Sequence, residues 1–355
     1  MFATFNKSAT FTANQIMQIH PLNRTFAAIL YTGIVSIVLP LHAANRVDFF
    51  GYSDCIRLEN DNVRVTLGHH AGGRVLEYTW KGTNAIWLDP DQAGWIHEPG
   101  EKRVGLCGGR FDIGPEKIIP RRDKLWLGAW KAEIIGPRAA RLTSQKDDGP
   151  GVQLIRTFRL DADSSKLTCQ QTIRNVSQET KEWCHWSRTF AQGHGICVIP
   201  VSEPSRFPNK YVMYESGRLI DIKPEDPNIR LRDGFIEIID TPRLPKLGMD
   251  SHTGWFAYLM KNDLMFVKKF PTYPDRVYNE AAGLTISIWY YKDEKCELEP
   301  IGPRERLSPG EAASFTEEWH LLPQPFPTDR RKPNLPAIQQ RVKNALRLVF
   351  APNAD

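Results

Sequence analysis

The fold of this chain is easiest to read in Cys55–Trp87, whose sequence is CIRLENDNVRVTLGHHAGGRVLEYTWKGTNAIW. Apolar and polar residues alternate in Cys55–Glu59 and again in Val63–Leu67, and a turn-forming Asn-Asp-Asn stands between the two runs. A Gly-Gly pair precedes a third run at Arg74–Trp80, and a Lys-Gly-Thr-Asn turn leads into a fourth at Ala85–Leu88. Because alternation with a period of two is typical of half-buried strands, this stretch predicts antiparallel strands joined by short turns.

The same pattern continues along the chain and predicts a mostly β domain. Turn residues separate further candidate strands at intervals of roughly ten residues, which is the spacing of a sandwich or barrel. Residues 89–125 are rich in Gly, Pro and charge and predict a long loop, whereas 201–250 predict an insertion or long loop with one short strand at Phe235–Ile239. The other candidate strands are Trp130–Ile135, Ala140–Ser144, Gln153–Leu160, Lys166–Arg174, Glu182–Thr189, Ile196–Pro200, Gly254–Met260, Leu264–Phe270, Leu284–Tyr291, Cys296–Pro300 and Ala312–Leu321.

The first 44 residues differ from the rest, because they contain Lys7 and Arg24 but no acidic residue. An apolar run at Phe26–Leu41 follows and ends in small residues, which together are typical of a signal peptide. We expect cleavage after residue 44, with Met17 as an alternative start, and a periplasmic or secreted protein. The alternative is an uncleaved anchor, but a run of about 16 residues is short for a stable membrane span, and none is expected after cleavage.

Composition and short motifs exclude several classes of function. The net charge of +5 is scattered without a basic stripe, so a nucleic-acid partner is not expected. The chain has no phosphate-binding Gly-rich loop, no GxSxG and no HExxH, and we expect neither a cofactor nor a metal. His69 and His70 are adjacent and would face opposite sides of a strand. The even number of cysteines allows disulfides, with Cys169–Cys184 as one candidate pair and buried free thiols as the alternative.

The sequence divides the mature chain into a large domain and a tail. The strand pattern extends over residues 45–323. Residues 324–355 are basic and rich in proline, and Leu335–Phe350 carries apolar residues at helical spacing. We therefore expect one amphipathic helix in the tail, packed on the β domain.

The chain resembles the galactose mutarotase-like (aldose 1-epimerase-like) superfamily in three segments that occur in the family's order. Cys55–Trp87 is similar to its first strands, and Thr172–Phe190 (TIRNVSQETKEWCHWSRTF) is similar to the strand pair that carries a catalytic His. Cys296–Leu322 (CELEPIGPRERLSPGEAASFTEEWHLL) is similar to its closing pattern. The resemblance spans residues 50–322 and is strongest to exported bacterial members that form a domain family of unknown function. It implies a β-supersandwich with a sugar-sized cleft on its concave face.

The resemblance also implies acid–base chemistry on a sugar, with a Glu as the base and a His as the acid. Glu299 best matches the family's Glu, and Glu297 fits nearly as well. Residues two apart on a strand point to the same face, so the two carboxylates should lie about 7 Å apart along it. His185 matches the catalytic His. Leu127 stands where the family carries a second catalytic His, and a leucine cannot transfer a proton.

Cationic and aromatic residues supply the candidates for substrate binding. Arg74 and Arg110 each follow a Gly-Gly pair that would let the backbone approach a ligand, although ordinary turns with salt-bridged arginines are the alternative. Strand alternation puts Trp186 and Arg188 on the face opposite His185 unless a bulge intervenes. Lys246 and Lys269 would add positive charge and would suit an acidic sugar such as a uronate. The full set is Arg74, Arg110, Trp186, Arg188, Lys246 and Lys269.

These patterns predict an exported protein that binds a sugar in the cleft or acts on it by epimerase-like chemistry. The expected ligand is a small molecule or an oligosaccharide. The alternative, favoured by Leu127, is a non-catalytic sugar-binding or structural accessory domain that has lost mutarotase activity.

Overall fold

A computed structural model describes residues 44–98, 100, 102–216, 219–291 and 294–346 of the 355-residue chain. Apart from Ala44, the expected signal peptide lies outside these residues, as do positions 347–350 of the expected C-terminal helix. Within the described ranges, no helix combines the length and apolar character needed to cross a membrane.

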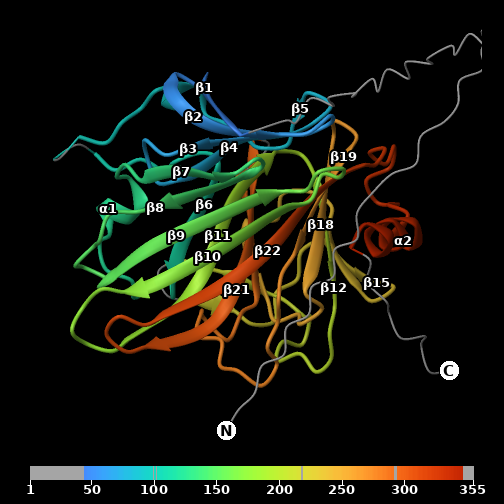
Figure 1. Ribbon diagram of the computed structural model, residues 1–355. Coiled ribbons are helices and arrows are strands. Elements are labelled where there is room, and N and C mark those ends of the chain that lie inside the picture. The colour runs from blue at the N-terminus through green and yellow to red at the C-terminus, as the bar shows by residue number, and fades with distance from the viewer. Residues whose placement is uncertain (1–43, 99, 101, 217–218, 292–293, 347–355) are drawn as a thin grey trace, which may run out of the picture. The chain divides into compact units, whose positions relative to one another are not determined.

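The domain consists of two antiparallel sheets, which we call the large sheet and the small sheet (Figure 1). The large sheet contains, in spatial order, β1 (Asn45–Phe49), β2 (Tyr52–Glu59), β3 (Arg64–Gly68), β4 (Arg74–Trp80), β6 (Gly109–Gly114), β11 (Lys181–Gln192), β21 (Lys295–Leu307), β20 (Ile286–Tyr291), β17 (Lys246–Met249), β13 (Val212–Tyr214) and β14 (Ile220–Asp221), and β5 (Thr83–Asn84) pairs with β4. The small sheet contains β15 (Ile229–Arg232), β16 (Phe235–Ile238), β12 (Ile196–Pro200), β18 (Trp255–Met260), β19 (Leu264–Lys269), β22 (Ala312–Pro323), β10 (Leu167–Asn175), β9 (Val152–Leu160), β8 (Ala139–Thr143) and β7 (Lys131–Gly136).

The main core lies between the two sheets. Ile113 and Leu298 of the large sheet and Phe266 and Trp319 of the small sheet belong to one buried apolar cluster. Burial of this kind is the principal force that holds two such layers together. The mostly β architecture predicted from the alternating pattern is therefore confirmed.

Helix α2 (Leu335–Leu346) covers the other face of the small sheet and lies beside β12 and β18 (Figure 1). Its buried residues Ile338 and Val342 pack with Trp255 and Leu259 of β18. All of β18 is buried because its alternate residues face the main core and α2. The predicted packing of a tail helix on the domain is confirmed over this range.

Two predicted loop regions contain strands that belong to the two sheets. The segment 89–125 holds β6 and the short helices η1 (Pro90–Gln92) and α1 (Asp123–Trp126), so the prediction of an unbroken loop is wrong. The segment 201–250 contains β13 to β17 rather than one strand. These strands are only two to four residues long, which is too short for local alternation to reveal them. In addition, β16 and β17 pair with β12 and β20, which are more distant in the chain.

The cysteines form no disulfide. Cys55, Cys107, Cys169, Cys184, Cys197 and Cys296 are all buried as free thiols. The candidate pair Cys169–Cys184 is therefore wrong, and the alternative of buried thiols is confirmed.

Candidate functional site

Two carboxylates mark the centre of the large sheet on the face away from the small sheet. Glu297 and Glu299 of β21 are completely buried. Trp289 and Ser287 of β20 lie directly opposite them in the pairing register, so these side chains share one face. The predicted same-face placement of Glu297 and Glu299 is confirmed.

Arg188 joins the two carboxylates. Its Nε lies 3.3 Å from Oε1 of Glu297 and 3.0 Å from Oε1 of Glu299. Arg110 donates from Nη2 to the same Glu297 oxygen at 2.5 Å. Arg188 and Arg110 are opposite one another on β11 and β6, which explains why both reach β21 from one side. Each guanidinium is nearly buried, so its charge is weakly screened.

Further ion pairs surround this centre. Arg122, which precedes α1, donates from Nε to Oδ1 of Asp112 at 2.6 Å, while Lys246 pairs with Glu116. Arg188 also lies 3.7 Å from each of these two acidic side chains. We call the whole set the carboxylate–arginine cluster, and it comprises Arg110, Asp112, Glu116, Arg122, Arg188, Lys246, Glu297 and Glu299.

Aromatic rings enclose the cluster. Trp126 of α1 lies with its ring 4.1 Å from the guanidinium carbon of Arg110 and 5.4 Å from that of Arg188. The ammonium of Lys246 lies 4.6 Å from the Trp289 ring and 5.3 Å from the Trp186 ring. Aromatic faces with charged and polar groups beside them are the surfaces on which a sugar ring can stack while its hydroxyls form hydrogen bonds.

The two central carboxylates differ in protonation. Burial opposes ionisation of Glu297, but Arg188 and Arg110 outweigh it and lower its pKa. Burial and the neighbouring Glu297 raise the pKa of Glu299 to about 7. Two nearby carboxyl groups with pKa values moved apart can supply an ionised and a protonated group at the same pH.

Several buried polar atoms of this face have no hydrogen-bond partner among the described residues. They are both carboxyl oxygens of Glu299, Nε and Nη1 of Arg110, Oγ of Ser287 and Nε1 of Trp186. Buried polar atoms are normally satisfied. Arg188 lies within ion-pair distance of Glu299, but not in hydrogen-bonding geometry. The unpaired atoms thus include both hydrogen-bond donors and hydrogen-bond acceptors.

The structure separates His185 from the other predicted site residues. Its side chain is buried between the two sheets, where it stacks between Phe111 and Phe315 and its Nε2 lies 3.1 Å from the carbonyl oxygen of Ala313. Burial lowers its pKa to about 4. The expected convergence of His185 with Glu299 is therefore wrong, because the pleat of β11 turns alternate residues to opposite faces. The irregularity between Cys184 and Trp186 shifts the pairing with β21 without reversing this alternation.

Two other candidates lie outside the cluster. Arg74 is buried, and its donors contact Ala71 O, Cys107 and the hydroxyl of Tyr52. Arg74 thus has a structural role, although these hydrogen bonds stand in place of the salt bridge expected in the alternative. Lys269 is on the small sheet and pairs with Glu318. Arg110, Trp186, Arg188 and Lys246, by contrast, come together with Glu297 and Glu299.

Sequence reasoning missed Asp112, Glu116, Arg122 and Trp126. Asp112 stands two residues after Arg110, and this alternation could have indicated that both side chains lie on one face of a strand. The flanking glycines obscured it. No set of three or more metal-ligating side chains is grouped for a metal ion within the described ranges, and His69 and His70 lie beside each other with ring centroids 4.1 Å apart.

The raised pKa values predict that stability falls as pH rises toward neutrality. Glu299 and Glu280 each have a pKa of about 7 in the fold, against an ordinary 4.5. The folded state binds more protons than the unfolded state between these values, so the free energy of unfolding decreases by at most about 1.4 kcal/mol per pH unit for each carboxyl. Urea unfolding between pH 5 and 7.5 tests this. Glu299→Gln and Glu280→Gln should each flatten the curve, and a wild-type stability that rises over this interval would contradict the expectation.

Comparisons with known proteins support the fold. No protein-family model matches the sequence, and no curated protein matches it significantly. A galactose mutarotase-like protein from Lactobacillus casei is similar in structure at a TM-score of 0.54 and 11% identity, with 76% of this chain and 100% of that chain covered. A candidate aldose 1-epimerase from Escherichia coli K12 is similar at a TM-score of 0.53 and 11% identity, with 75% of this chain and 98% of that chain covered. A galactose mutarotase-like protein from Clostridium acetobutylicum is similar at a TM-score of 0.50 and 9% identity, with 79% of this chain and 98% of that chain covered. The chain therefore has the galactose mutarotase-like fold.

Proposed function

We propose that this protein binds a sugar at the carboxylate–arginine cluster, with Glu299 in its protonated form as a hydrogen-bond donor to the ligand. The observation that carries the proposal is the state of Glu299. Its carboxyl is completely buried, has a pKa of about 7 and forms no hydrogen bond with the described residues. Since an unsatisfied buried polar group costs about 1–3 kcal/mol, a ligand hydroxyl at this position would remove that cost.

Binding is favoured over mutarotation because the cluster lacks a histidine to act as the second proton-transfer group. His185 belongs to the inter-sheet core, and Leu127 is buried in an apolar cluster with Ala71 and Leu106. Glu297 is held ionised by Arg110 and Arg188, which makes it a weak base. The site therefore offers recognition groups more readily than a complete acid–base pair.

Two substitutions of Glu299 test the proposal. Glutamine matches the protonated carboxyl in shape and donates a hydrogen bond, so Glu299→Gln should retain sugar affinity. The affinity of wild type should fall above pH 7, where Glu299 loses its proton, and the affinity of Glu299→Gln should not. Leucine neither matches that shape nor donates a hydrogen bond, so Glu299→Leu should weaken binding about tenfold or more. A glycan array identifies the ligand, and calorimetry measures its affinity.

The matched control is Glu305→Gln on the same strand, where Glu305 pairs with Arg276 away from the cluster. It should leave affinity unchanged. If no sugar on the array binds, or if Glu299→Leu binds as tightly as wild type, the proposed function is wrong.

A second candidate function is epimerase-like catalysis, which the opposite pKa shifts of Glu297 and Glu299 favour. In that case Glu299 would exchange a proton with the anomeric hydroxyl, and Glu299→Gln would lower turnover about 100-fold or more while sugar binding persists. Polarimetry on freshly dissolved anomers separates the two functions. Wild type without turnover supports binding alone.

The proposal includes export, which rests on the basic flank and apolar run of residues 1–44. Fractionation of the native host should find the protein in the periplasm or medium, with a mature N-terminus near residue 45. A protein retained in the cytoplasm with residues 1–44 intact would contradict this part.

A further inference from the structure

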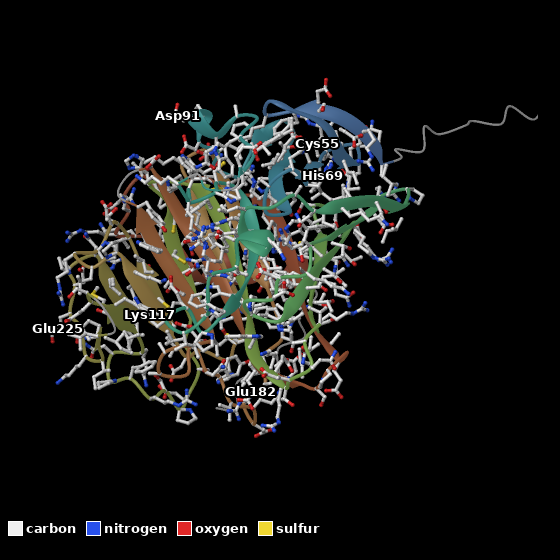
Figure 2. All side chains as sticks on the ribbon, turned by 90° about the vertical axis from the view of Figure 1, so that its left-hand side faces the viewer. Cys55, His69, Asp91, Lys117, Glu182 and Glu225 are labelled. Carbon is white, nitrogen blue, oxygen red and sulfur yellow. The ribbon has the colours of Figure 1, made fainter. Side chains whose placement is uncertain are left out.

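A pocket of about 340 Å³ opens beside the carboxylate–arginine cluster. The loop after β6 supplies Lys117 and Ile118, and the ends of β13 and β14 supply Tyr214, Leu219 and Ile220. Glu280, just before β20, completes it. Figure 2 shows Lys117 low on the face turned to the viewer, well below His69 and Cys55. The volume is within the range of small-molecule sites.

The inner wall of this pocket is also an outer wall of the cluster. Tyr214 donates from its hydroxyl to Oε1 of Glu280 at 3.1 Å, and the backbone N–H of Glu116 donates to Oε2 of Glu280 at 2.8 Å. Glu116 itself pairs with Lys246, and the Lys246 ammonium lies 5.0 Å from the Tyr214 ring. The pocket therefore borders the cluster at Glu116 and Lys246, and Tyr214 and Glu280 form the wall that they share.

The lining of the pocket combines apolar surface with a few polar groups. Ile118 is 63% exposed and Leu219 is 64% exposed, which is high for large apolar side chains beside a pocket. Exposed apolar side chains that gather around a pocket are typical of a binding surface. Tyr214 provides an aromatic ring, and Glu280 provides carboxyl oxygens at the buried end. An apolar wall facing a polar wall suits a sugar ring, which has C–H groups on its faces and hydroxyls at its edge.

The charges favour a neutral ring over an acidic one. Glu280 and the exposed Lys117 both line the pocket, and Glu116 stands directly behind Glu280. Lys246 is already paired with Glu116 and lies under the Tyr214 and Trp289 rings. Two acidic and two basic side chains therefore stand at this pocket, and it has no excess of positive charge that could compensate a carboxylate on the ligand.

We propose that this pocket, lined by Ile118, Tyr214, Leu219 and Glu280, is a second subsite for a neutral sugar ring. This inference rests on the proposed function, because it places the first ring at the carboxylate–arginine cluster. Its consequence is that the ligand contains at least two linked sugars. The first ring is recognised by Glu299, Arg110 and Arg188, and the second by the pocket.

The experiment compares the affinities of ligands that contain one, two or three sugar rings. A glycan array carrying neutral and acidic monosaccharides and the linked di- and trisaccharides of each identifies the strongest ligand. Calorimetry then compares that oligosaccharide with each of its component monosaccharides on the purified protein. We expect the strongest ligand to be neutral at the second ring and to bind about tenfold or more tightly than either monosaccharide.

Variants on the rim localise the second ring. Leu219→Ser and Ile118→Ser should each remove much of the advantage of the oligosaccharide and leave monosaccharide affinity within twofold of wild type. Both side chains are exposed, so the fold should tolerate the changes. Ile222→Ser is the matched control, because Ile222 is 58% exposed and is not part of the pocket lining.

The outcomes separate this inference from the proposed function. If monosaccharide and oligosaccharide bind equally and Glu299→Leu still weakens binding, the second subsite is wrong and the function stands. An oligosaccharide advantage that survives both rim variants also overturns the subsite. If no sugar binds at all, the proposed function fails, and the subsite fails with it.

Discussion

Replacing Lys268 by methionine is expected to lower the free energy of unfolding by about 3–5 kcal/mol. Lys268 and Glu317 are both completely buried between the sheets, with Nζ and Oε2 3.3 Å apart. Gln171 and the indole N–H of Trp319 also donate to Glu317, so its carboxylate is held in place. The substitution would remove the cation in direct contact with this buried negative charge, which is the costly way to break a buried ion pair.

Equilibrium unfolding in urea measures the effect, and the neighbouring pair provides the control. Lys269 and Glu318 are about one-third exposed and lie 3.2 Å apart, so Lys269→Met should cost at most about 1 kcal/mol. Adding Glu317→Gln to Lys268→Met should recover part of the loss, because it removes the unpaired charge. Equal effects of Lys268→Met and Lys269→Met would show that burial does not set the energy of these pairs.

Lys268 also connects the core to the candidate site. Its ammonium donates to the hydroxyls of Ser187 and Thr189, at 3.0 and 2.8 Å, and to the carbonyl oxygen of Leu298 at 3.1 Å. Ser187 and Thr189 flank Arg188, and Leu298 stands between Glu297 and Glu299. The ammonium of Lys268 thus binds both β11 and β21 on the core side of the large sheet, and these two strands carry Arg188, Glu297 and Glu299 on the other side. Sugar affinity should fall in Lys268→Met even where the protein remains folded.

Arg188→Met is expected to have an effect of similar size on stability and a larger one on ligand binding. Arg188 is the cation shared by Glu297 and Glu299, and it also lies near Asp112 and Glu116. Its loss should cost about 3–5 kcal/mol near neutral pH, because buried carboxylates would be left undercompensated. The cost should shrink toward pH 5, where Glu299 is protonated. Sugar binding should become undetectable.

An exposed arginine on the neighbouring strand provides the comparison. Arg306 of β21 pairs with Glu182 of β11 and is 74% exposed, so Arg306→Met should change stability by at most about 1 kcal/mol and leave affinity unchanged. Urea unfolding at pH 5 and 7.5, with calorimetry on the same samples, tests both statements. A loss that is the same at both pH values would contradict the assigned role of Arg188 as the counter-ion of these carboxylates.

Local sequence pattern predicted part of the geometry of the candidate site. The spacing of Glu297 and Glu299 placed both on one face of a strand, and the same alternation placed Trp186 and Arg188 opposite His185. The prediction of His185 as a partner of Glu299 failed because it followed the resemblance to a family motif rather than the pleat. The strand β6 was missed because it has a glycine at each end and charged residues within it, a composition that is typical of a loop.

The sequence by itself determined the strand alternation, the amphipathic helix and the shared face of Glu297 and Glu299, because each depends on residues close together in the chain. Only the tertiary structure decided which strands became neighbours. That pairing brought Arg110 of β6, Arg188 of β11 and Lys246 of β17 around β21, and it buried their charges together. Burial and Coulomb interactions depend on distance in space rather than along the chain. The raised pKa of Glu299 and the pocket beside Glu280 are therefore properties of the assembled sheet.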